Sequence, residues 1–369
     1  MSFRAFIAVG FTLGVTALGG LVVRLSAGDV RRDLTAAALV HDNQPQREWR
    51  LVDKKHWQIV GPEGEDPAIT DAVEGTRGAC GPGMVEVAGN MKSDPARHVV
   101  FDPDSVEEMQ KKTCTKWLQK EYPERCAEFD RTAWLAMSKD IPTHPMHFCM
   151  DRFEYPNKKG AYPVIFINFN EAADVCKAAG KRLCSEDEWT FACEGEEATP
   201  YPYGYTRSAD TCVIDAKWRA FNERAMQSGR DTPETMMELD RLWQGVPSGS
   251  RPGCKSVFGV YDMTGNVDEW THTSREGERP SILKGGYWGP VRTRCRPSTR
   301  SHDESHVFYQ QGFRCCTDGP AMGAPVHKVS YESSTPTSLD PTRSTSPSKS
   351  GTDARSRPTL APDPTLSRE

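Results

Sequence analysis

The chain has 369 residues, of which 37% are hydrophobic and 26% charged, so its middle part can bury a sizeable core. Its 46 basic and 51 acidic side chains give a net charge of −5, and no basic stripe runs along the sequence, which argues against nucleic acid as a partner. All 12 cysteines lie between Cys80 and Cys316, and their even number is typical of a disulfide-bonded domain outside the reducing cytoplasm.

The N-terminal segment 1–27 carries an uncharged apolar run from Phe6 to Val23, between Arg4 and Arg24. A run of this length is typical of a signal peptide or of a short membrane anchor. The residues that follow it make only a weak cleavage site, which favours an anchor that is kept. Either form predicts an exported protein of the cell envelope or periplasm, and the anchor would attach it to the membrane.

Polar segments flank the cysteine-rich part of the chain. Residues 28–79 show no sustained periodicity of 2 or 3.6 and are predicted to be a polar linker. Residues 319–369 are rich in Ser, Thr and Pro and cannot bury enough apolar surface to offset the cost of ordering, so a disordered tail is expected. Because no internal repeat divides the rest, residues 80–318 are predicted to form a single domain of the α+β class.

Cap residues predict two helices in the first half of this domain. Ser105 and Glu108 form a capping-box pattern that starts the first helix, and Tyr122, which precedes a proline, ends it. Asn170 is the expected N-cap of the second helix, and Gly180 supplies the left-handed residue that stops it. The apolar residues of the second helix share one face, which is therefore expected to be buried.

A third helix is predicted directly afterwards. Ser185 and Glu188 repeat the capping-box pattern, and Gly195 ends the helix. Cys193 lies on its apolar face, as Cys176 does in the second helix, so both sulfur atoms are expected to point at the core.

Short strands separated by Gly and Pro turns are predicted at 164–169, 282–288 and 312–316. The polar segment 219–253 is predicted to be a long insertion. Much of the domain is therefore expected to be irregular, with little regular secondary structure.

Several motifs in a fixed order carry a family resemblance. They are Cys-Gly-Pro-Gly-Met-Val at 80–85, Gly-Lys-Arg-Leu-Cys-Ser-Glu-Asp-Glu-Trp at 180–189, Tyr-Pro-Tyr-Gly at 201–204, Gly-Val-Tyr-Asp-Met-Thr-Gly-Asn-Val-Asp-Glu-Trp at 259–270, Lys-Gly-Gly at 284–286 and Gly-Phe-Arg-Cys at 312–315. Together they resemble the sulfatase-modifying-factor domain of formylglycine-generating enzymes, in a bacterial, cysteine-rich form. The resemblance implies a compact, irregular α+β fold related to C-type lectins, but it does not by itself assign a function.

The resemblance also implies two disulfide bonds, Cys176–Cys315 and Cys193–Cys295. Cys114 and Cys126 are close enough in sequence to bridge across the end of the first helix. The other cysteines can complete six bridges, but the sequence leaves their connectivity open. They are Cys80, Cys149, Cys184, Cys212, Cys254 and Cys316.

The turn around Gly265 combines carboxylates with carbonyl oxygens, which are the ligands that calcium prefers. The resemblance implies a calcium site formed by the side chains of Asp262 and Glu269 and by the carbonyls of Gly265 and Val267. An aspartate stands at 262, where the family usually has an asparagine. The alternative is a solvated turn in which Asp268 and Glu269 bind no metal.

Copper chemistry in the family depends on two cysteines that follow the Lys-Gly-Gly strand, because soft thiolates hold Cu(I). Here Tyr287 replaces the family's active-site serine, and Cys295 is the position of an implied disulfide. Copper is therefore not expected at the family's usual ligands. Cys316 or another thiol would have to supply ligands from a different place.

The aromatic and basic residues around this segment suggest a pocket. His302 and His306 could share a helix face and, with Glu304, suggest a non-haem iron site. A polar pocket rim explains the same histidines, and large aromatic and arginine side chains suit recognition. The pocket candidates are Tyr287, Trp288, Arg292, Arg294, His302, His306 and Tyr309.

Three functions remain open at this point. The family resemblance, together with the altered metal site, favours a divergent exported domain that serves recognition or unassigned chemistry. Its expected partner is an exported protein or an envelope ligand. An alternative is an oxygen-dependent oxidase that converts a cysteine of exported sulfatases to formylglycine. A further alternative is a non-haem iron enzyme.

Overall fold

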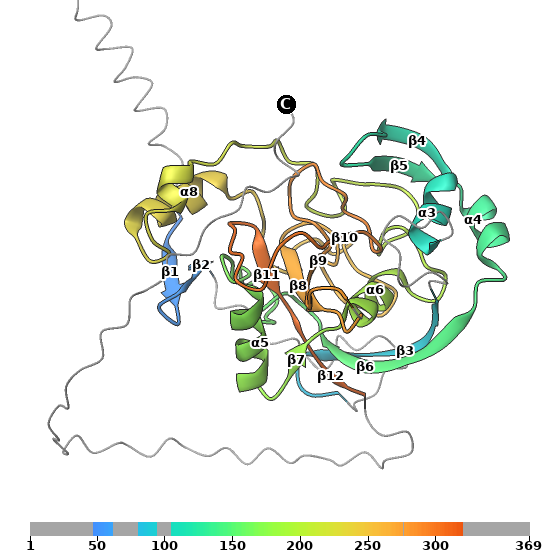
Figure 1. Ribbon diagram of the computed structural model, residues 1–369, viewed down its shortest axis with the longest axis horizontal. Helices are drawn as coiled ribbons and strands as arrows, with labels where there is room; N and C mark the ends of the chain where they lie inside the picture. Colours follow the sequence, from blue (N-terminus) through green and yellow to red (C-terminus); the bar gives the residue numbers. More distant parts are fainter. Residues whose placement is uncertain (1–46, 62–79, 94–104, 276, 320–369) are drawn as a thin grey trace, which may run out of the picture. The chain divides into compact units, whose positions relative to one another are not determined.

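The computed structural model describes residues 47–61, 80–93, 105–275 and 277–319. Short strands and short helices alternate with long irregular connections in a folded unit that begins at Glu48 (Figure 1). The predicted α+β fold with little regular secondary structure is thereby confirmed. No helix among the described residues is long and apolar enough to span a membrane.

Two of the predicted segments lie outside the described residues. These are the N-terminal signal peptide or anchor, 1–27, and the tail 319–369, of which only Gly319 is described.

The folded unit starts with a hairpin that the sequence analysis missed. Strands β1 (Trp49–Val52) and β2 (His56–Ile59) pair antiparallel, and all four residues of β2 are buried. The indole nitrogen of Trp49 donates to Asp240 in α8 (Pro233–Leu242) at 2.9 Å. The predicted polar linker 28–79 therefore does not hold for these residues. Four-residue strands are too short to show a clear alternation, and their packing partners lie far away in the sequence.

One four-stranded sheet has the order β3-β6-β12-β7. Its strands are Met84–Lys92, Thr143–Asp151, Cys315–Asp318 and Arg182–Leu183. β3 and β6 run side by side (Figure 1) and pair antiparallel from Met84↔Asp151 to Lys92↔Thr143. Their inward-facing residues pack with those of α6 (Glu186–Glu194) in a hydrophobic cluster that includes Val87, Phe148 and Trp189.

A second four-stranded sheet has the order β10-β9-β8-β11. Its strands are Ser298–Thr299, Ser281–Lys284, Asp268–His272 and Gln311–Phe313. β8 and β11 are parallel, and the other pairs are antiparallel. This sheet carries the candidate functional site.

The three predicted strands differ from the observed ones in their length and in their pairing. The strand predicted at 282–288 ends at Lys284, because Gly285 turns the chain with a φ of +88°. The segment 312–316 divides at Arg314 and contributes to both four-stranded sheets. The segment 164–169 makes only one bridge, Trp57↔Ile165, because Phe166 has a φ of +63° and leaves the extended conformation.

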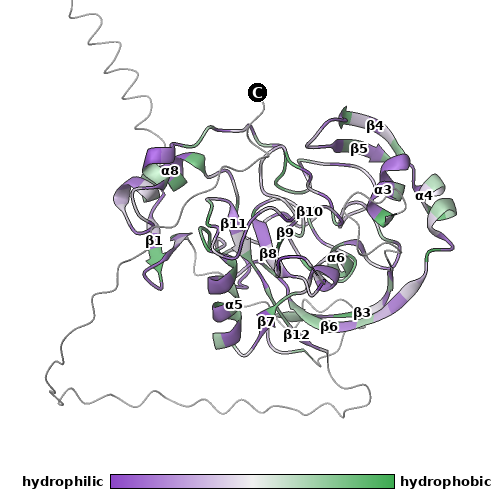
Figure 2. Ribbon diagram, in the orientation of Figure 1, coloured by the Kyte–Doolittle hydropathy of each residue, from purple (hydrophilic) through white to green (hydrophobic). Residues whose placement is uncertain are grey.

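The second and third helices follow from their caps. α6 (Glu186–Glu194) has the predicted reciprocal capping box between Ser185 and Glu188. α5 (Phe169–Ala178) is capped by Asn168, two positions before the predicted residue, because only this asparagine has a glutamate, Glu171, three positions later. Bands of hydrophilic and hydrophobic colour alternate along α5 (Figure 2), as expected for a helix with one buried face.

The connection between β3 and β6 contains four further elements. They are α3 (Val106–Lys112), β4 (Cys114–Gln119), β5 (Arg125–Phe129) and α4 (Arg131–Ser138). We call residues 105–142 the β3–β6 connection. The first predicted helix starts after Ser105 as expected, but it ends at Thr113. The rest of its predicted length is β4, because the chain there pairs with β5.

The polar insertion 219–253 also contains regular structure. The short helix α7 (Glu223–Met226) packs against α8, and Glu238 of α8 accepts a hydrogen bond from the backbone N–H of Asn222 at 2.6 Å. Leu239 and Leu242 of α8 are buried in the same hydrophobic cluster as Trp57. The insertion is therefore part of the core rather than a surface loop.

Six disulfide bonds pair all twelve cysteines, and no free cysteine remains. The structure contains the three predicted bonds, Cys114–Cys126, Cys176–Cys315 and Cys193–Cys295. The other three are Cys80–Cys149, Cys184–Cys316 and Cys212–Cys254. Such a set of bonds indicates an oxidising compartment.

Candidate functional site

The Lys-Gly-Gly turn at the end of β9 begins the candidate site. Gly285 and Gly286 have φ angles of +88° and +68°, in the region that favours glycine. A Cβ atom on Gly285 would lie 2.9 Å from the carbonyl oxygen of Met263, and one on Gly286 would lie 2.8 Å from a methyl group of Thr293. The turn therefore requires both glycines, and it directs the next residue, Tyr287, into a pocket.

The pocket lies where this turn meets β8, β9 and β10. Three of the predicted residues line it, namely Tyr287, Arg292 and His302. Asp268 and Gln310, which were not predicted as pocket residues, line it as well. Asp268 begins β8 and Gln310 directly precedes the parallel strand β11, and the backbone N–H of Asp268 donates to the Gln310 carbonyl at 2.9 Å. The sequence could not show this pairing, because the two strands are distant in the chain.

The other four predicted pocket residues, Trp288, Arg294, His306 and Tyr309, do not line the pocket. Trp288 and Tyr309 are buried in the hydrophobic core, each only 2% exposed. Arg294 is buried too and forms an ion pair with Glu107 of α3 at 3.3 Å. Tyr287 belongs to the same hydrophobic cluster, and its ring contacts those of Trp288 and Tyr309, but of these three residues only Tyr287 lines the pocket.

The two histidines do not form the expected iron site. The segment 302–306 is not helical, and the rings of His302 and His306 are stacked, with their centroids 3.8 Å apart. His306 Nδ1 lies 2.8 Å from the amide nitrogen of Gln311, and Glu304 accepts a hydrogen bond from Ser281 at 3.2 Å. Across the described ranges, no group of three or more His, Cys, Asp or Glu side chains is arranged to hold a metal.

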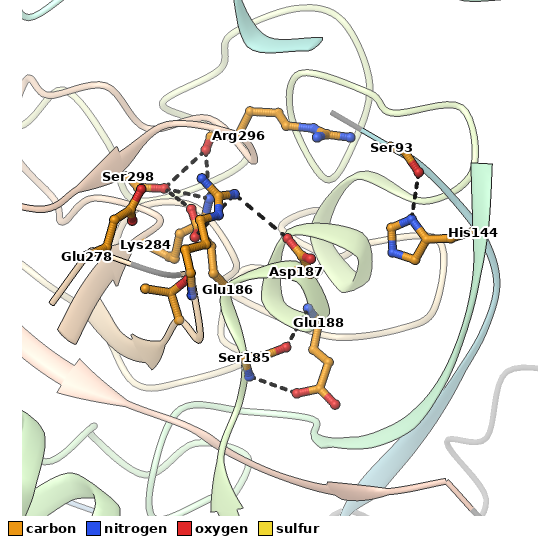
Figure 3. A network of polar contacts seen from close by, with 12 residues as sticks. Ser93, His144, Ser185, Glu186, Asp187, Glu188, Glu278, Lys284, Arg296 and Ser298 are labelled. Carbon is orange, nitrogen blue, oxygen red and sulfur yellow. Dashed lines mark hydrogen bonds and ion pairs between the residues drawn. The ribbon is translucent and has the colours of Figure 1, made fainter. Parts of the chain in front are cut away.

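A buried polar network supports the pocket wall at Ser298. The ammonium group of Lys284 donates to the Arg296 carbonyl at 2.7 Å and to Ser298 Oγ at 3.3 Å (Figure 3). Ser298 Oγ in turn donates to Glu186 Oε1 at 2.8 Å. Burial lowers the pKa of Lys284 to about 8, although the carboxylate of Glu186 opposes this. The network fixes β10 against β9 and so holds one side of the pocket in place.

The pocket contains no thiol. Cys295, which follows the pocket loop, is bonded to Cys193, and Cys316 is bonded to Cys184. Neither of them presents a thiolate to a metal ion while these bonds are intact.

The predicted calcium ligands lie in a buried acidic cluster. The carboxylate of Glu269 accepts hydrogen bonds from Arg314 Nε at 2.6 Å and Nη2 at 2.7 Å. Asp262 accepts a hydrogen bond from the backbone N–H of Gly249 at 2.6 Å, and burial raises its pKa to about 7. The sequence analysis missed Glu154, whose pKa is raised by its complete burial and by the charges of Asp262 and Glu269.

As arranged, these residues do not fit a calcium ion. Both oxygens of Glu269 accept hydrogen bonds from Arg314, and Oε2 accepts another from Trp189, so a buried cation already competes with a metal for this carboxylate. Asp262 is then the one carboxylate of the predicted set that no arginine binds, beside the carbonyl groups of Gly265 and Val267. Calcium therefore stays a prediction of the resemblance.

Comparison with known proteins identifies relatives of two kinds. The model of the sulfatase-modifying factor enzyme 1-like domain matches residues 104–319. The inactive C-alpha-formylglycine-generating enzyme 2 of Bos taurus is 27% identical over 183 residues, which are 43% of this chain and 52% of the relative. The formylglycine-generating enzyme of Mus musculus is 26% identical over 178 residues, which are 42% of this chain and 44% of that enzyme. The chain thus spans about half the length of the curated relatives it matches.

Solved structures share less sequence with the chain. CarF has a TM-score of 0.37 and 13% identity, over 64% of this chain and 97% of CarF. PvdO from Pseudomonas aeruginosa has a TM-score of 0.33 and 18% identity, over 48% of this chain and 84% of PvdO. These values are too low to transfer a function. The family model, in contrast, covers more than half of the chain, and the protein therefore belongs to the sulfatase-modifying factor enzyme 1-like domain family.

Proposed function

We propose that this domain recognises a segment of an exported protein in the pocket beside Tyr287 and does not oxidise cysteine through copper. The observation that carries the proposal is the pairing of all twelve cysteines in disulfide bonds. Copper-dependent oxidation needs thiolate ligands next to the substrate, and a pocket without a thiol lacks them.

The shape of the pocket supports the same conclusion. Tyr287 is 4% exposed, and its ring makes edge contacts with Trp288 and Tyr309 at centroid distances of 5.6 and 6.1 Å. These neighbours hold the ring in one position, so the pocket has a rigid aromatic wall where the family's enzymes have a small serine. Rigid aromatic groups with a few polar groups beside them are typical of recognition sites.

The polar groups of the pocket differ in character from one side to the other. Asp268 and Gln310 offer hydrogen-bond acceptors, whereas Arg292 offers donors and a positive charge. A polypeptide has both donors and acceptors along its backbone, so an extended segment can satisfy both sides at once. This is why we favour a peptide over a simple apolar ligand.

The relatives do not decide between recognition and oxidation. One relative is named as an inactive enzyme and the other as a formylglycine-generating enzyme, and their identities to this chain are 27% and 26%. Similarity of this size leaves both activities open, so the chemistry of the site must decide.

A direct assay tests the proposal. The purified protein is incubated with Cu(I), oxygen and a sulfatase-type cysteine peptide, and the aldehyde product is measured by mass spectrometry. We expect no aldehyde, while an active formylglycine-generating enzyme under the same conditions provides the positive control. Binding of the same protein to an array of exported-protein peptides is measured in parallel. Aldehyde formation by the wild type would overturn the proposal, as would an array without any bound peptide.

A further inference from the structure

One arginine of the pocket wall differs from its neighbours. Arg292 lines the pocket, and no carboxylate of the described residues forms an ion pair with it. The other arginines of the segment 292–300 all pair with glutamates. These pairs are Arg294 with Glu107, Arg296 with Glu194, and Arg300 with Glu186 and Glu278.

The hydrogen bonds of Arg292 within the protein are long. Its Nη2 atom lies 3.3 Å from the Ser298 carbonyl oxygen and 3.5 Å from Thr299 Oγ1, at the upper limit for hydrogen bonds. Its remaining N–H groups donate to no acceptor among the described residues and can serve a ligand. A partly buried cation without a counter-ion costs free energy, and an anionic ligand would offset this cost.

The ring of Tyr122 helps to position the guanidinium group. Its centroid lies 5.0 Å from Arg292 Cζ, which is a cation–π contact. Tyr122 itself is 53% exposed, so its ring covers one face of Arg292 without closing the pocket. The next residue, Pro123, lines the pocket as well. The turn between β4 and β5 thus contributes to the site.

Ion pairs connect this hairpin to the loop that carries Arg292. Arg125 of β5 pairs with Asp215 at 3.3 Å, and Asp215 also pairs with Arg207 at 2.7 Å. Arg207 Nη2 then donates to the Val291 carbonyl at 3.1 Å, directly before Arg292. The β3–β6 connection is therefore held against the pocket loop, and this arrangement keeps Tyr122 beside Arg292.

We propose that Arg292, Tyr122 and Thr299 form a subsite for an anionic group of the ligand. The guanidinium group binds the anion, the Tyr122 ring orients the guanidinium, and the Thr299 hydroxyl donates a further hydrogen bond. The anion is a carboxylate, or a sulfate or phosphate ester, carried by the bound segment. This inference rests on the proposed function for the ligand being a peptide, and it adds the charge that the peptide must carry.

A peptide array tests the subsite. Each peptide is synthesised in matched forms with Asp, Glu, phosphoserine or sulfotyrosine at one position and with Asn, Gln, Ser or Tyr in its place. We expect the affinity of the wild type for the acidic forms to be at least about 10-fold higher than for the neutral forms. Arg292→Gln should abolish this preference, and Arg292→Lys should retain part of it. The preferred acidic form identifies the source of the anion.

Two further variants separate a local effect from a general one. Arg224→Gln removes the same charge from an exposed residue of α7 and should leave the preference unchanged. Tyr122→Ala should weaken the binding of acidic peptides several-fold, whereas Tyr122→Phe, which keeps the ring, should leave their binding unchanged. Circular dichroism melts of every variant show whether it is folded.

Small anions provide a second arm that needs no peptide. Thermal melts of the wild type and of Arg292→Gln are recorded in sodium sulfate, phosphate or acetate, at constant ionic strength against sodium chloride. We expect a larger stabilisation of the wild type than of Arg292→Gln, because the general stabilising effect of these anions acts on both proteins and only the wild type has the binding site.

The combined results distinguish the two proposals. Peptide binding without an acidic preference, or a preference that survives Arg292→Gln, would overturn the subsite and leave the recognition function standing. If no peptide binds but small anions stabilise the protein in a way that depends on Arg292, the recognition function would be overturned and the subsite would stand. Absence of both effects would overturn both proposals.

Discussion

Arg314 binds Glu269 through two hydrogen bonds of 2.6 and 2.7 Å, and both side chains are fully buried. Glu269 belongs to β8, and Arg314 stands between β11 and β12, so the pair joins the two four-stranded sheets. Trp189 of α6 donates a third hydrogen bond to Glu269 at 2.9 Å. The centre of the domain is therefore held by a charged pair as well as by apolar packing.

Breaking this pair should destabilise the protein strongly. Glu269→Ala leaves the Arg314 charge buried without a partner, and we expect the free energy of unfolding to fall by about 3–5 kcal/mol. Guanidinium chloride unfolding with the disulfides intact measures the change. Glu128→Ala is the control, because it breaks the exposed Lys116–Glu128 pair and should cost under about 1 kcal/mol. Similar losses in the two variants would contradict this account.

A second carboxylate makes stability depend on pH in the acidic range. Although burial alone would raise the pKa of Glu171, hydrogen bonds from His56 and Arg230 lower it to about 2, from an ordinary value of 4.5. The unfolded state therefore binds the proton more tightly, and the stabilisation is complete above pH 4.5 and is lost as the pH falls towards 2. We expect Glu171→Gln to cost about 2 kcal/mol at pH 7.

The same variant should cost progressively less as the pH is lowered, because the wild type loses its charge. Urea unfolding at pH 7, 4.5 and 3 measures the difference between the two proteins. Glu121→Gln, at an exposed position, is the control and should change little at any pH. A cost for Glu171→Gln that is the same at pH 7 and 3 would show that its charge does not matter.

Calcium removal tests the prediction that the resemblance makes. Because Arg314 occupies both oxygens of Glu269, we expect a chelator to leave the melting temperature of the wild type unchanged. Asp262→Asn is the matched variant, since it keeps an acceptor for the Gly249 N–H but loses the charge. A fall of several degrees with chelator in the wild type and not in Asp262→Asn would show that calcium binds and that Arg314 releases Glu269.

The thiol content can be counted directly. We expect fewer than one reactive thiol per chain when the protein is denatured without a reductant, because all twelve cysteines are paired. Reduction before the titration should reveal all twelve. Two reactive thiols before reduction would provide possible copper ligands and so support the oxidase function. Mass spectrometry of the labelled peptides would locate them.

The sequence predicted best those elements whose information is local. α6 was predicted from cap to cap, because Ser185, Glu188 and Gly195 act within the helix itself. α5 was predicted with its cap displaced by two residues. The disulfides Cys176–Cys315 and Cys193–Cys295 came from the resemblance, since no local pattern connects residues so far apart.

Other features depend on partners that are distant in the chain. Nothing near β2 indicates that Trp57 packs with Leu239 and Leu242. The position of Glu154 beside Asp262 likewise follows only from the folded arrangement. For the site, the aromatic and basic residues after the Lys-Gly-Gly motif predicted Tyr287, Arg292 and His302, but Gln310 reaches the pocket through the parallel pairing of β11 with β8.

The disulfides and the pocket are distributed unequally between the two large sheets. Three of the bonds, Cys80–Cys149, Cys176–Cys315 and Cys184–Cys316, end on β6 or β12 of one sheet. The pocket is built on β8, β9 and β10 of the other. Substitutions at the pocket surface can therefore accumulate while the covalent framework keeps the fold, which offers evolution a way to exchange an enzyme's substrate or chemistry for a new ligand on an unchanged scaffold.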